Sequence, residues 1–399
     1  RSLVKNVAPG EEAVVALPFA KRFEGVVSFE DTGEPAPHAR LSIWASQQPQ
    51  FGSMVSVSGE ADAQGRYRIT PRPGIRFGIT AFPPDGTPYL PRTIPNDEAI
   101  HWTSADLVKQ VDVTLPRGIL VRGQILEEGS GTAVAGATIQ YMPESSNNPN
   151  VADDILTGWQ ATQVSDDGGR FAIAVLPGPG RLLVQKSDGG FVYREVTDRE
   201  LSRSEVGGRR NYAHGILVLN PAEDAESIDV TISLESGNSV TGRVVDAADR
   251  PIEAVLVVSR LNVNPLTLSW RGFTEPTPGA RFELTGLRDD EEYPVFFLDA
   301  TNRLGATVVL RAADEPITVK LEPCGIATAR FLDVEGNPHV GHQPMLQMVV
   351  TPGTDPYDFK AAQRGEIAAD SDYVANVDRT NYLPGPSTDE AGRIALPAL

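Results

Sequence analysis

The chain has 399 residues, with 53 acidic and 35 basic side chains and a formal net charge of −18 at neutral pH. This charge disfavours nucleic acid or an anionic lipid surface as partner, because both bind concentrated positive charge. The 37 glycines and 32 prolines disfavour long helices and favour short strands joined by tight turns.

Two short phrases recur in a fixed order along the chain. The first is a strand ending in Gly-x-Val, and the second has the form Asp-x-x-Gly-Arg-aromatic. Copies of the second phrase occupy residues 62–67, 166–171, 277–282 and 389–394. The fourth residue of each copy (Gly65, Gly169, Ala280 and Gly392) lies 104, 111 and 112 positions after the one before it. Such a period predicts tandem copies of one domain.

The repeats predict four domains, each large enough to bury its own core. We expect residues 1–17 to be the end of a preceding unit, 18–116 the first repeat, 117–235 the second with a long insertion, 236–322 the third, and 323–399 the fourth, incomplete at its C-terminal side. Because the chain starts at Arg1 and stops within a repeat, we expect it to be part of a longer polypeptide.

In chain order, alternating apolar residues predict the strands of each unit. In the first unit they are 23–29, 39–44, 54–57, 67–70, 77–81 and 111–115; in the second, 120–126, 137–141, 160–164, 171–175 and 181–185; in the third, 239–246, 254–260, 282–285, 295–299 and 317–321; and the fourth begins at 326–333. About seven short strands per unit favour tandem antiparallel β-sandwiches, an all-β fold.

Short helices are expected only within insertions. Residues 197–200 have the capping-box pattern Thr-x-x-Glu within the insertion 187–225. In the insertion 355–382, Asp355 and Pro356 suit an N-cap and a first helical position.

The two phrases together resemble the carboxypeptidase-regulatory-like domain. The second unit fits best, through Gly123, Ala137, Asp166, Gly169, Arg170, Phe171, Pro177 and Gly178. The resemblance implies a transthyretin-like (prealbumin-like), Ig-like sandwich of seven strands, similar in shape to the B-type repeats of bacterial adhesins. It further implies a non-catalytic role in spacing or in binding protein or carbohydrate, in the periplasm or at the cell surface of a bacterium.

The sequence offers weak candidates for chemistry, and we predict no enzyme, no cofactor and no metal site. His339 and His342 have a possible ligand spacing but lie in a Gly/Pro loop, so a solvated loop is the favoured interpretation. The acids Asp370, Asp372 and Asp378 lack the regular pattern of a calcium loop. No metalloprotease, nucleophile-elbow or P-loop motif occurs.

Aromatic residues recur at one position of three units. Trp159, Trp270 and Tyr382 each lie 12 residues before the last residue of the second phrase. One interpretation is a structural position that packs on the sandwich; the other is an exposed platform on which sugars stack. Exposure of the rings decides between them.

A local basic and aromatic cluster spans residues 207–214 and contains Arg209, Arg210 and Tyr212. Its guanidinium groups could hold an anionic or sugar ligand. Alternatively, they pair with neighbouring acids such as Glu205 and Glu223 and fix the insertion.

Two functional hypotheses follow. The first is a non-enzymatic scaffold and interaction region of a larger envelope protein, which presents loops to a protein or a cell-envelope polysaccharide. The second is an array of carbohydrate-binding modules that uses the exposed aromatics.

Overall fold

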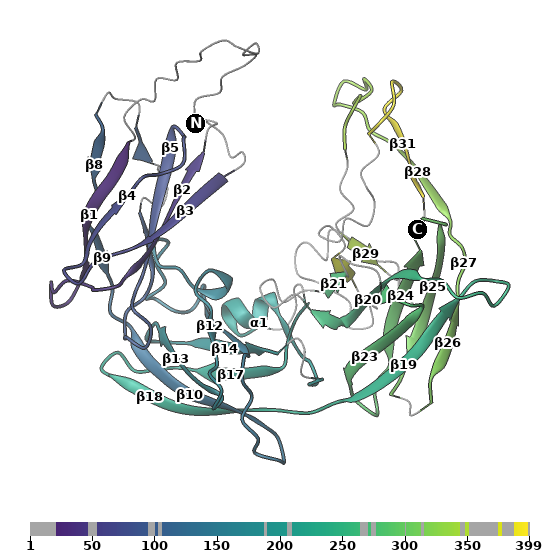
Figure 1. The fold of residues 1–399 in the computed structure, drawn as a ribbon, viewed down its shortest axis with the longest axis horizontal. Helices are drawn as coiled ribbons and strands as arrows, with labels where there is room; N and C mark the ends of the chain where they lie inside the picture. The colour runs from purple at the N-terminus through teal and green to yellow at the C-terminus, as the bar shows by residue number, and fades with distance from the viewer. Residues whose placement is uncertain are drawn as a thin grey trace, which may run out of the picture.

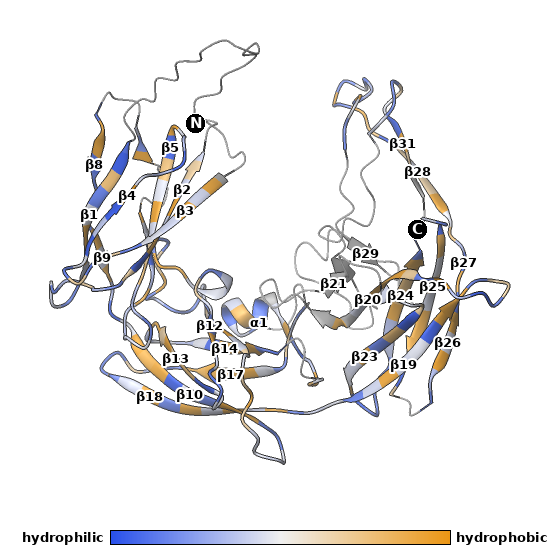
Figure 2. Ribbon diagram, in the orientation of Figure 1, coloured by the Kyte–Doolittle hydropathy of each residue, from blue (hydrophilic) through white to orange (hydrophobic). Residues whose placement is uncertain are grey.

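The computed structural model describes residues 21–46, 54–94, 100–102, 106–186, 190–205, 210–263, 270–272, 277–299, 301–312, 315–343, 348–350, 374–376 and 387–397. The chain is almost entirely β (Figure 1), which confirms the predicted fold class. In β23 (Arg281–Leu287), exposed and buried residues alternate along most of the strand, and Figure 2 shows hydrophobic and hydrophilic residues within single strands. No helix in the described ranges is both long enough and apolar enough to cross a membrane.

The first unit is a sandwich of two sheets. One sheet contains β1 (Arg22–Phe29), β4 (Arg66–Ile69), β8 (Val108–Gln110) and β9 (Val113–Leu115). The other contains β2 (Arg40–Ser46), β3 (Met54–Glu60), β5 (Arg76–Phe82), β6 (Arg92–Ile94) and β7 (Ile100–His101). Phe23, Ile43 and Ile79 are fully buried in the core that these sheets share.

The second unit repeats this plan and adds a subdomain. Its sheets are β13 (Arg170–Val175), β10 (Ile119–Glu127) and β18 (Ser227–Leu234), and β12 (Gln163–Val164), β11 (Thr138–Pro143), β14 (Gly180–Gln185) and β17 (Gly215–Leu219). The additional elements are the 3₁₀-helix η1 (Gly158–Gln160), the hairpin of β15 (Arg194–Thr197) and β16 (Arg210–Ala213), and α1 (Asp198–Arg203). Thr197 and Glu200 form the predicted capping box of α1.

The third unit has a separate core that contains Val244, Val255 and Phe297. Its sheets are β23 (Arg281–Leu287), β19 (Asn238–Val245) and β26 (Ile317–Lys320), and β20 (Ala254–Val263), β21 (Trp270–Gly272), β22 (Thr277–Pro278), β24 (Tyr293–Asp299), β25 (Leu304–Leu310) and β27 (Glu322–Pro323).

Of the fourth unit, the structure describes two pairs of strands. They are β28 (Ile326–Arg330) with β31 (Arg393–Pro397), and β29 (Met348–Val350) with β30 (Val374–Asn376). The helix expected from Asp355 and Pro356 lies outside the described residues, as do residues 1–17.

One strand pair in each of the first three units departs from the expected antiparallel pattern. The first strand pairs in parallel with the last, as β1 with β8 and β9, β10 with β18, and β19 with β26. The other ladders are antiparallel. Two parallel neighbouring strands have to be joined by a long connection. In each unit, the strands between the first and the last form this connection.

The recurring Asp-x-x-Gly-Arg phrase is a turn held by its own side chain. Oδ1 of Asp166 accepts hydrogen bonds from the backbone N–H groups of Gly168 (2.9 Å) and Arg170 (2.8 Å). Asp62 and Asp389 make the same two contacts at the corresponding places. Turns at Asp246 and Asp333, which the sequence analysis did not single out, have the same geometry.

The glycine of this phrase is required by backbone conformation and by a close approach. Gly169 has φ +71°, and a Cβ there would lie 2.4 Å from the carbonyl oxygen of Ile125. In the degenerate third copy, Ala280 keeps the left-handed φ, at 57°. The amide of the first strand donates to this position in all four units, as Val244 does to Ala280 (2.8 Å).

The two recurring phrases meet across one strand pair, which explains why they recur together. Gly123 lies opposite Phe171, and a Cβ at Gly123 would lie 2.2 Å from the Phe171 ring. Gly25 faces Tyr67 and Gly242 faces Phe282 in the same register. In the fourth unit, Ala329 replaces the glycine and faces Ile394, whose side chain is smaller than the aromatic rings of the other units.

Candidate binding surface between the first two units

The loop of residues 83–91 of the first unit forms the contact with the second. Its turn is closed by Thr87, whose Oγ1 donates to the carbonyl oxygen of Pro84 (2.7 Å). Prolines at 83, 84, 88 and 91 restrict the backbone of this loop before it makes any contact. A loop fixed in this way can position side chains with little loss of entropy.

Two consecutive residues of this loop enter two different cores. Tyr89 is 7% exposed within the core of the first unit, where its ring stacks on Phe29 with centroids 3.9 Å apart. Leu90 is 1% exposed within the core of the second unit, together with Ile119 and Leu176. The pair therefore joins the two units through apolar packing.

Backbone hydrogen bonds continue the junction on both sides of Leu90. The amide of Leu90 donates to Pro116 (2.9 Å), and that of Gly118 donates to Pro88 (2.7 Å). Beyond the loop, Thr93 donates to the carbonyl oxygen of Asp154 (2.8 Å). The two units thus share a short ladder as well as a core residue.

Charged side chains cross the same junction. Asp31 accepts from Arg117 (2.9 Å) and from the Tyr89 hydroxyl (2.9 Å). The hydrogen bond from Arg117, followed by that from Tyr89, holds the pKa of Asp31 below its ordinary value. Arg92 pairs with Asp154 at 2.8 Å and also donates to Thr114.

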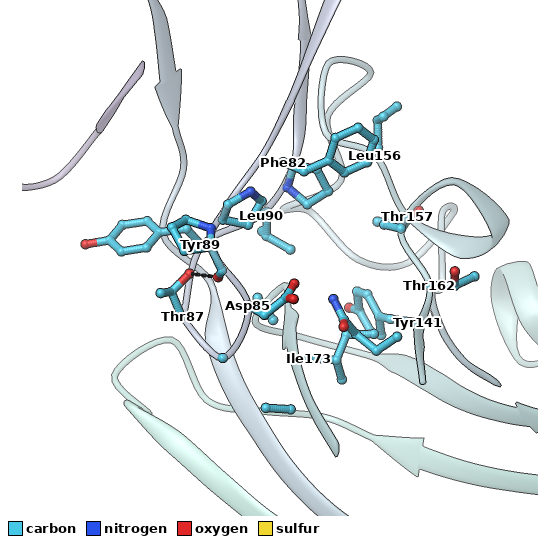
Figure 3. A pocket seen from close by; sticks show the side chains of 18 of the residues that line it. Phe82, Asp85, Thr87, Tyr89, Leu90, Tyr141, Leu156, Thr157, Thr162 and Ile173 are labelled. Carbon is cyan, nitrogen blue, oxygen red and sulfur yellow. Dashed lines mark hydrogen bonds between the residues drawn. The ribbon is translucent and has the colours of Figure 1, made fainter. Parts of the chain in front are cut away.

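A cavity of about 280 Å³ lies between this loop and the second unit (Figure 3). Phe82 and Leu156 lie close together on one side of it, and Asp85 and Tyr141 lie apart from them (Figure 3). Arg40 pairs with Asp85 at 3.4 Å and lies over the Phe82 ring. Burial raises the pKa of Tyr141, so its hydroxyl stays protonated and donates to Leu176.

A more open groove of about 640 Å³ adjoins the cavity through Asp85 and Gln163. Arg122, Arg170 and Asp229 line it. Guanidinium, carboxamide and carboxylate groups beside aromatic rings suit the binding of a polar ligand. Among the described residues that line the cavity, Asp85 is the one carboxylate.

Trp159 lies beside this cavity and is the exposed aromatic of the predicted set. It occupies η1, whose neighbours Thr157 and Gln160 line the cavity, and it is 60% exposed. The amide of Leu156 donates to Pro91 of the first unit (2.9 Å), which ties this segment to the junction. Trp159 therefore meets the exposure requirement of a stacking platform; whether it binds sugar stays a prediction.

Of the other two aromatics of the pattern, the structure describes only the backbone of Trp270. Trp270 begins β21 on the strand paired with β20, and its side chain lies outside the described residues. Tyr382 lies outside them altogether. In the first unit the equivalent residue is Val55, which is 43% exposed on β3. The position is thus on a paired strand in the first and third units but in a 3₁₀-helix in the second.

The structure describes only part of the basic and aromatic cluster. Tyr212 is 2% exposed, so its ring is buried, and a role of this residue in ligand binding stays a prediction. Arg209 lies outside the described residues, and of Arg210 only the backbone, at the start of β16, lies within them. The arginine part of the hypothesis stays a prediction.

A buried ion pair, which the sequence analysis missed, joins β14 to the segment after β11, and its arginine also donates to Glu200 and Ser204 of the insertion 187–225. Nη1 of Arg181 lies 3.0 Å from Oε1 of Glu144, with side chains 10% and 6% exposed. Burial alone would raise the pKa of Glu144, but hydrogen bonds from Ser204 and Asn147 and the charge of Arg181 outweigh it and lower that pKa. The sequence analysis could not find this pair, because Glu144 and Arg181 are 37 positions apart and no short-range pattern links them.

The histidine pair remains a solvated loop. His339 and His342 are exposed, with ring centroids 4.9 Å apart. Within the part of the chain that the structure describes, no three His, Cys, Asp or Glu side chains are grouped as metal ligands. Asp370, Asp372 and Asp378 lie outside it.

Comparisons place the chain in no family. No family model and no curated protein matches its sequence. Among solved structures it is similar to a Streptococcal ancillary pilin (TM-score 0.31, 11% identity, covering 75% of this chain and 98% of that one). It is also similar to the Bacillus anthracis TIE protein (TM-score 0.22, 11% identity, 75% and 49%) and to the shaft pilin SpaA from Lactobacillus rhamnosus GG (TM-score 0.22, 10% identity, 54% and 98%). Similarity at this level assigns no function.

Proposed function

We propose that this chain is a non-enzymatic scaffold and interaction region of a larger bacterial envelope protein. It sets the spacing and angle between successive sandwiches and presents their insertions to a partner. The observation that supports this most directly is the burial of Tyr89 and Leu90 in two neighbouring cores. A junction made of shared core residues resists bending, whereas a polar linker leaves the units free to reorient.

Spin-label distance measurements test the spacing role. With Cys324→Ser as background, labels at the exposed residues Val55 and Val218 report on the first and second units. We expect a narrow distance distribution that Leu90→Ala broadens. A wild-type distribution as broad as that of units on a free linker would contradict the scaffold.

The envelope setting has its own test. Fractionation of the source cells, with an antibody to this chain, should place it in the periplasm or at the surface. Recovery in the cytoplasm alone would remove the envelope part of the proposal and leave the spacing role standing.

A second candidate function, carbohydrate binding, is favoured by Trp159. A largely exposed indole, whose neighbour Gln160 lines the cavity together with Gln163 and Arg40, has the stacking face and the hydrogen-bonding groups that a sugar requires. Affinity electrophoresis in gels that contain polysaccharides should retard the wild-type protein but not Trp159→Ala. Val309→Ala, at a residue 57% exposed on β25 of the third unit and outside the cavity and the groove, is the matched control. No retardation by any polysaccharide rejects this candidate.

A further inference from the structure

In each of the first three units, the first and the last strand form a parallel pair. In the second unit this pairing runs without interruption from Leu120 opposite Ser227 to Glu127 opposite Leu234. β10 and β18 lie side by side (Figure 1). The strand on which the chain enters the unit is therefore hydrogen-bonded directly to the strand on which it leaves.

Short linkers carry the chain from the last strand of one unit to the first strand of the next. Residues 116–118 join β9 to β10, and residues 235–237 join β18 to β19. A tension along the chain therefore passes through the parallel pairs in turn. The other strands and the insertions branch off this path, since both α1 and η1, with Trp159, lie between β11 and β17 of the second unit.

The parallel direction decides how tension acts on such a pair. The chain enters β10 at Ile119 and leaves β18 at Leu234, and these residues lie at opposite ends of the ladder. The ladder hydrogen bonds run across the strands, so the pull slides one strand along the other and loads all the bonds together. If the first and last strands were antiparallel, they would be pulled apart from one end, and their bonds would break one after another.

Each linker is also held by backbone outside the ladder. In the second unit the amide of Val192 donates to Glu235 (2.8 Å), and that of Gly237 donates to Gly190 (2.9 Å). The amide of Leu90 holds the first linker in the same way, and β27 after the third unit pairs with β25. These bonds hinder peeling of the last strand from its C-terminal end, because the linker has to detach first.

We propose that the chain bears mechanical tension through these parallel pairs and that the second unit resists it most strongly. The ladder of the first unit is interrupted at Val26, whose amide donates to the side chain of Asp112 (2.9 Å) instead of to backbone. The ladder described in the third unit is short, with Gly242–Val245 opposite Ile317–Lys320. Load bearing goes beyond the spacing role, because it keeps the units folded under tension while the insertions stay unloaded.

Pulling on single molecules of the 399-residue protein, through handles at its two ends, tests the proposal. Each unit is recognised by the length of chain that it releases, at most roughly 340, 420 and 300 Å from the first to the third unit for a fully extended chain. We expect the longest of these steps at the highest force. The proposed ranking is overturned if this step comes at a lower force than the other two.

The choice of pulling points separates load bearing from ordinary stability. In the Cys324→Ser background, handles at Ser130→Cys and Ser236→Cys are attached to exposed residues beyond the C-terminal ends of β10 and β18, so the ladder is peeled from that end. The same variant pulled from its two ends is the reference, with an identical free energy of unfolding. Forced unfolding depends on the unfolding rate rather than on that free energy, so we expect a several-fold lower force when the second unit is peeled. Equal forces in the two geometries would overturn the proposal and leave the spacing role standing.

Two proline variants of β18 test the ladder bonds themselves. Leu234 accepts from Glu128 across the ladder (2.8 Å), and backbone directions alternate along a strand, so Val230 faces β10 and Thr231 faces away from it. Val230→Pro removes a ladder donor and should lower the unfolding force in end-to-end pulling, whereas Thr231→Pro keeps every donor of the ladder and should leave that force unchanged. Equal forces for the two variants would contradict load bearing by the ladder. If Val230→Pro does not fold, the comparison of pulling points still decides.

Discussion

The junction between the first and second units and that between the second and third are built differently. At the first junction, Leu90 of one unit is buried in the core of the other, and three residues separate the buried Leu115 from Ile119. At the second, the linker of residues 235–239 is polar, and the strap of residues 190–192 pairs with its backbone through Gly190 and Val192.

The second junction depends on close backbone contact where the first depends on apolar burial. A Cβ at Gly286 would lie 2.3 Å from the carbonyl oxygen of Phe191, and one at Gly237 would meet Gly286 at 2.6 Å. Phe191 itself belongs to the core of the second unit. We therefore expect the first junction to be the more rigid of the two and the second to be more sensitive to local changes.

The largest effect is expected from Leu90→Ala. Removing a fully buried Leu should cost about 2–5 kcal/mol of unfolding free energy. It should also uncouple the first two units. Hydrogen exchange on the full chain should show lost protection at the amides of Gly118 and Leu156. Leu107→Ala, at a residue 40% exposed, is the control, and equal exchange in both variants would contradict the shared-core junction.

At the second junction, Gly286→Ala should cost about 1–3 kcal/mol, because it forces a left-handed φ of +81° and a backbone clash. Gly279→Ala separates the two causes, since Gly279 has φ +70° but open space around its Cα. Faster exchange at Val192 in the first variant but not in the second is expected. If the two variants behave alike, the close contact with Phe191 is not what holds this junction.

Acid should loosen the second junction before the first. His214 stacks on Tyr193 beside the strap, and burial lowers its pKa to about 3 from 6.5. The unfolded ring takes up a proton below 6.5 while the folded ring does not. Stability is therefore lost as pH falls from 6.5 toward 3, by up to about 1.4 kcal/mol per pH unit. Asp31 at the first junction, whose pKa is lowered from 3.8, loses its contribution only at still lower pH.

Hydrogen exchange measured between pH 4 and 7 and corrected for intrinsic rates checks this order. Protection of β15 and β16 should fall near pH 5 while that of Leu90 persists. His214→Asn retains an acceptor for the Lys186 amide and removes the titration, so its profile should be flat. An unchanged slope in that variant would assign the pH response to other groups.

The smallest effect is expected from Arg288→Ala. Its guanidinium pairs with Glu235 at 3.2 Å across the second junction, but the side chains are 39% and 33% exposed, so water and salt screen the pair. A loss of about 0–1 kcal/mol that disappears in high salt is expected in denaturation experiments. Arg311→Ala, which breaks a pair with Glu292 inside the third unit, is the control. A loss above that range would show that charge contributes more to this junction than the comparison indicates.

The repeated turns could be predicted because their causes are local. Asp166 accepts hydrogen bonds from amides two and four residues away, and the need for glycine at position 169 follows from the positive φ of that residue. The capping box at Thr197 is equally local. The aromatic position of Trp159 was also found from the sequence. Whether its ring is exposed depends on residues distant in the chain, so the sequence alone left both interpretations open.

The sequence by itself determined the class of fold and the spacing of the repeated turns, since short-range hydrogen bonds and alternation encode them. That the strand of Gly123 pairs with the strand of Phe171 was decided by the tertiary structure. Only the tertiary structure decided that Leu90 enters a neighbouring core, that Tyr212 is covered, and that Glu144 meets Arg181. These contacts join residues far apart in the chain. Their free energy comes from desolvation and packing that arise when the sheets come together, and no local pattern specifies them.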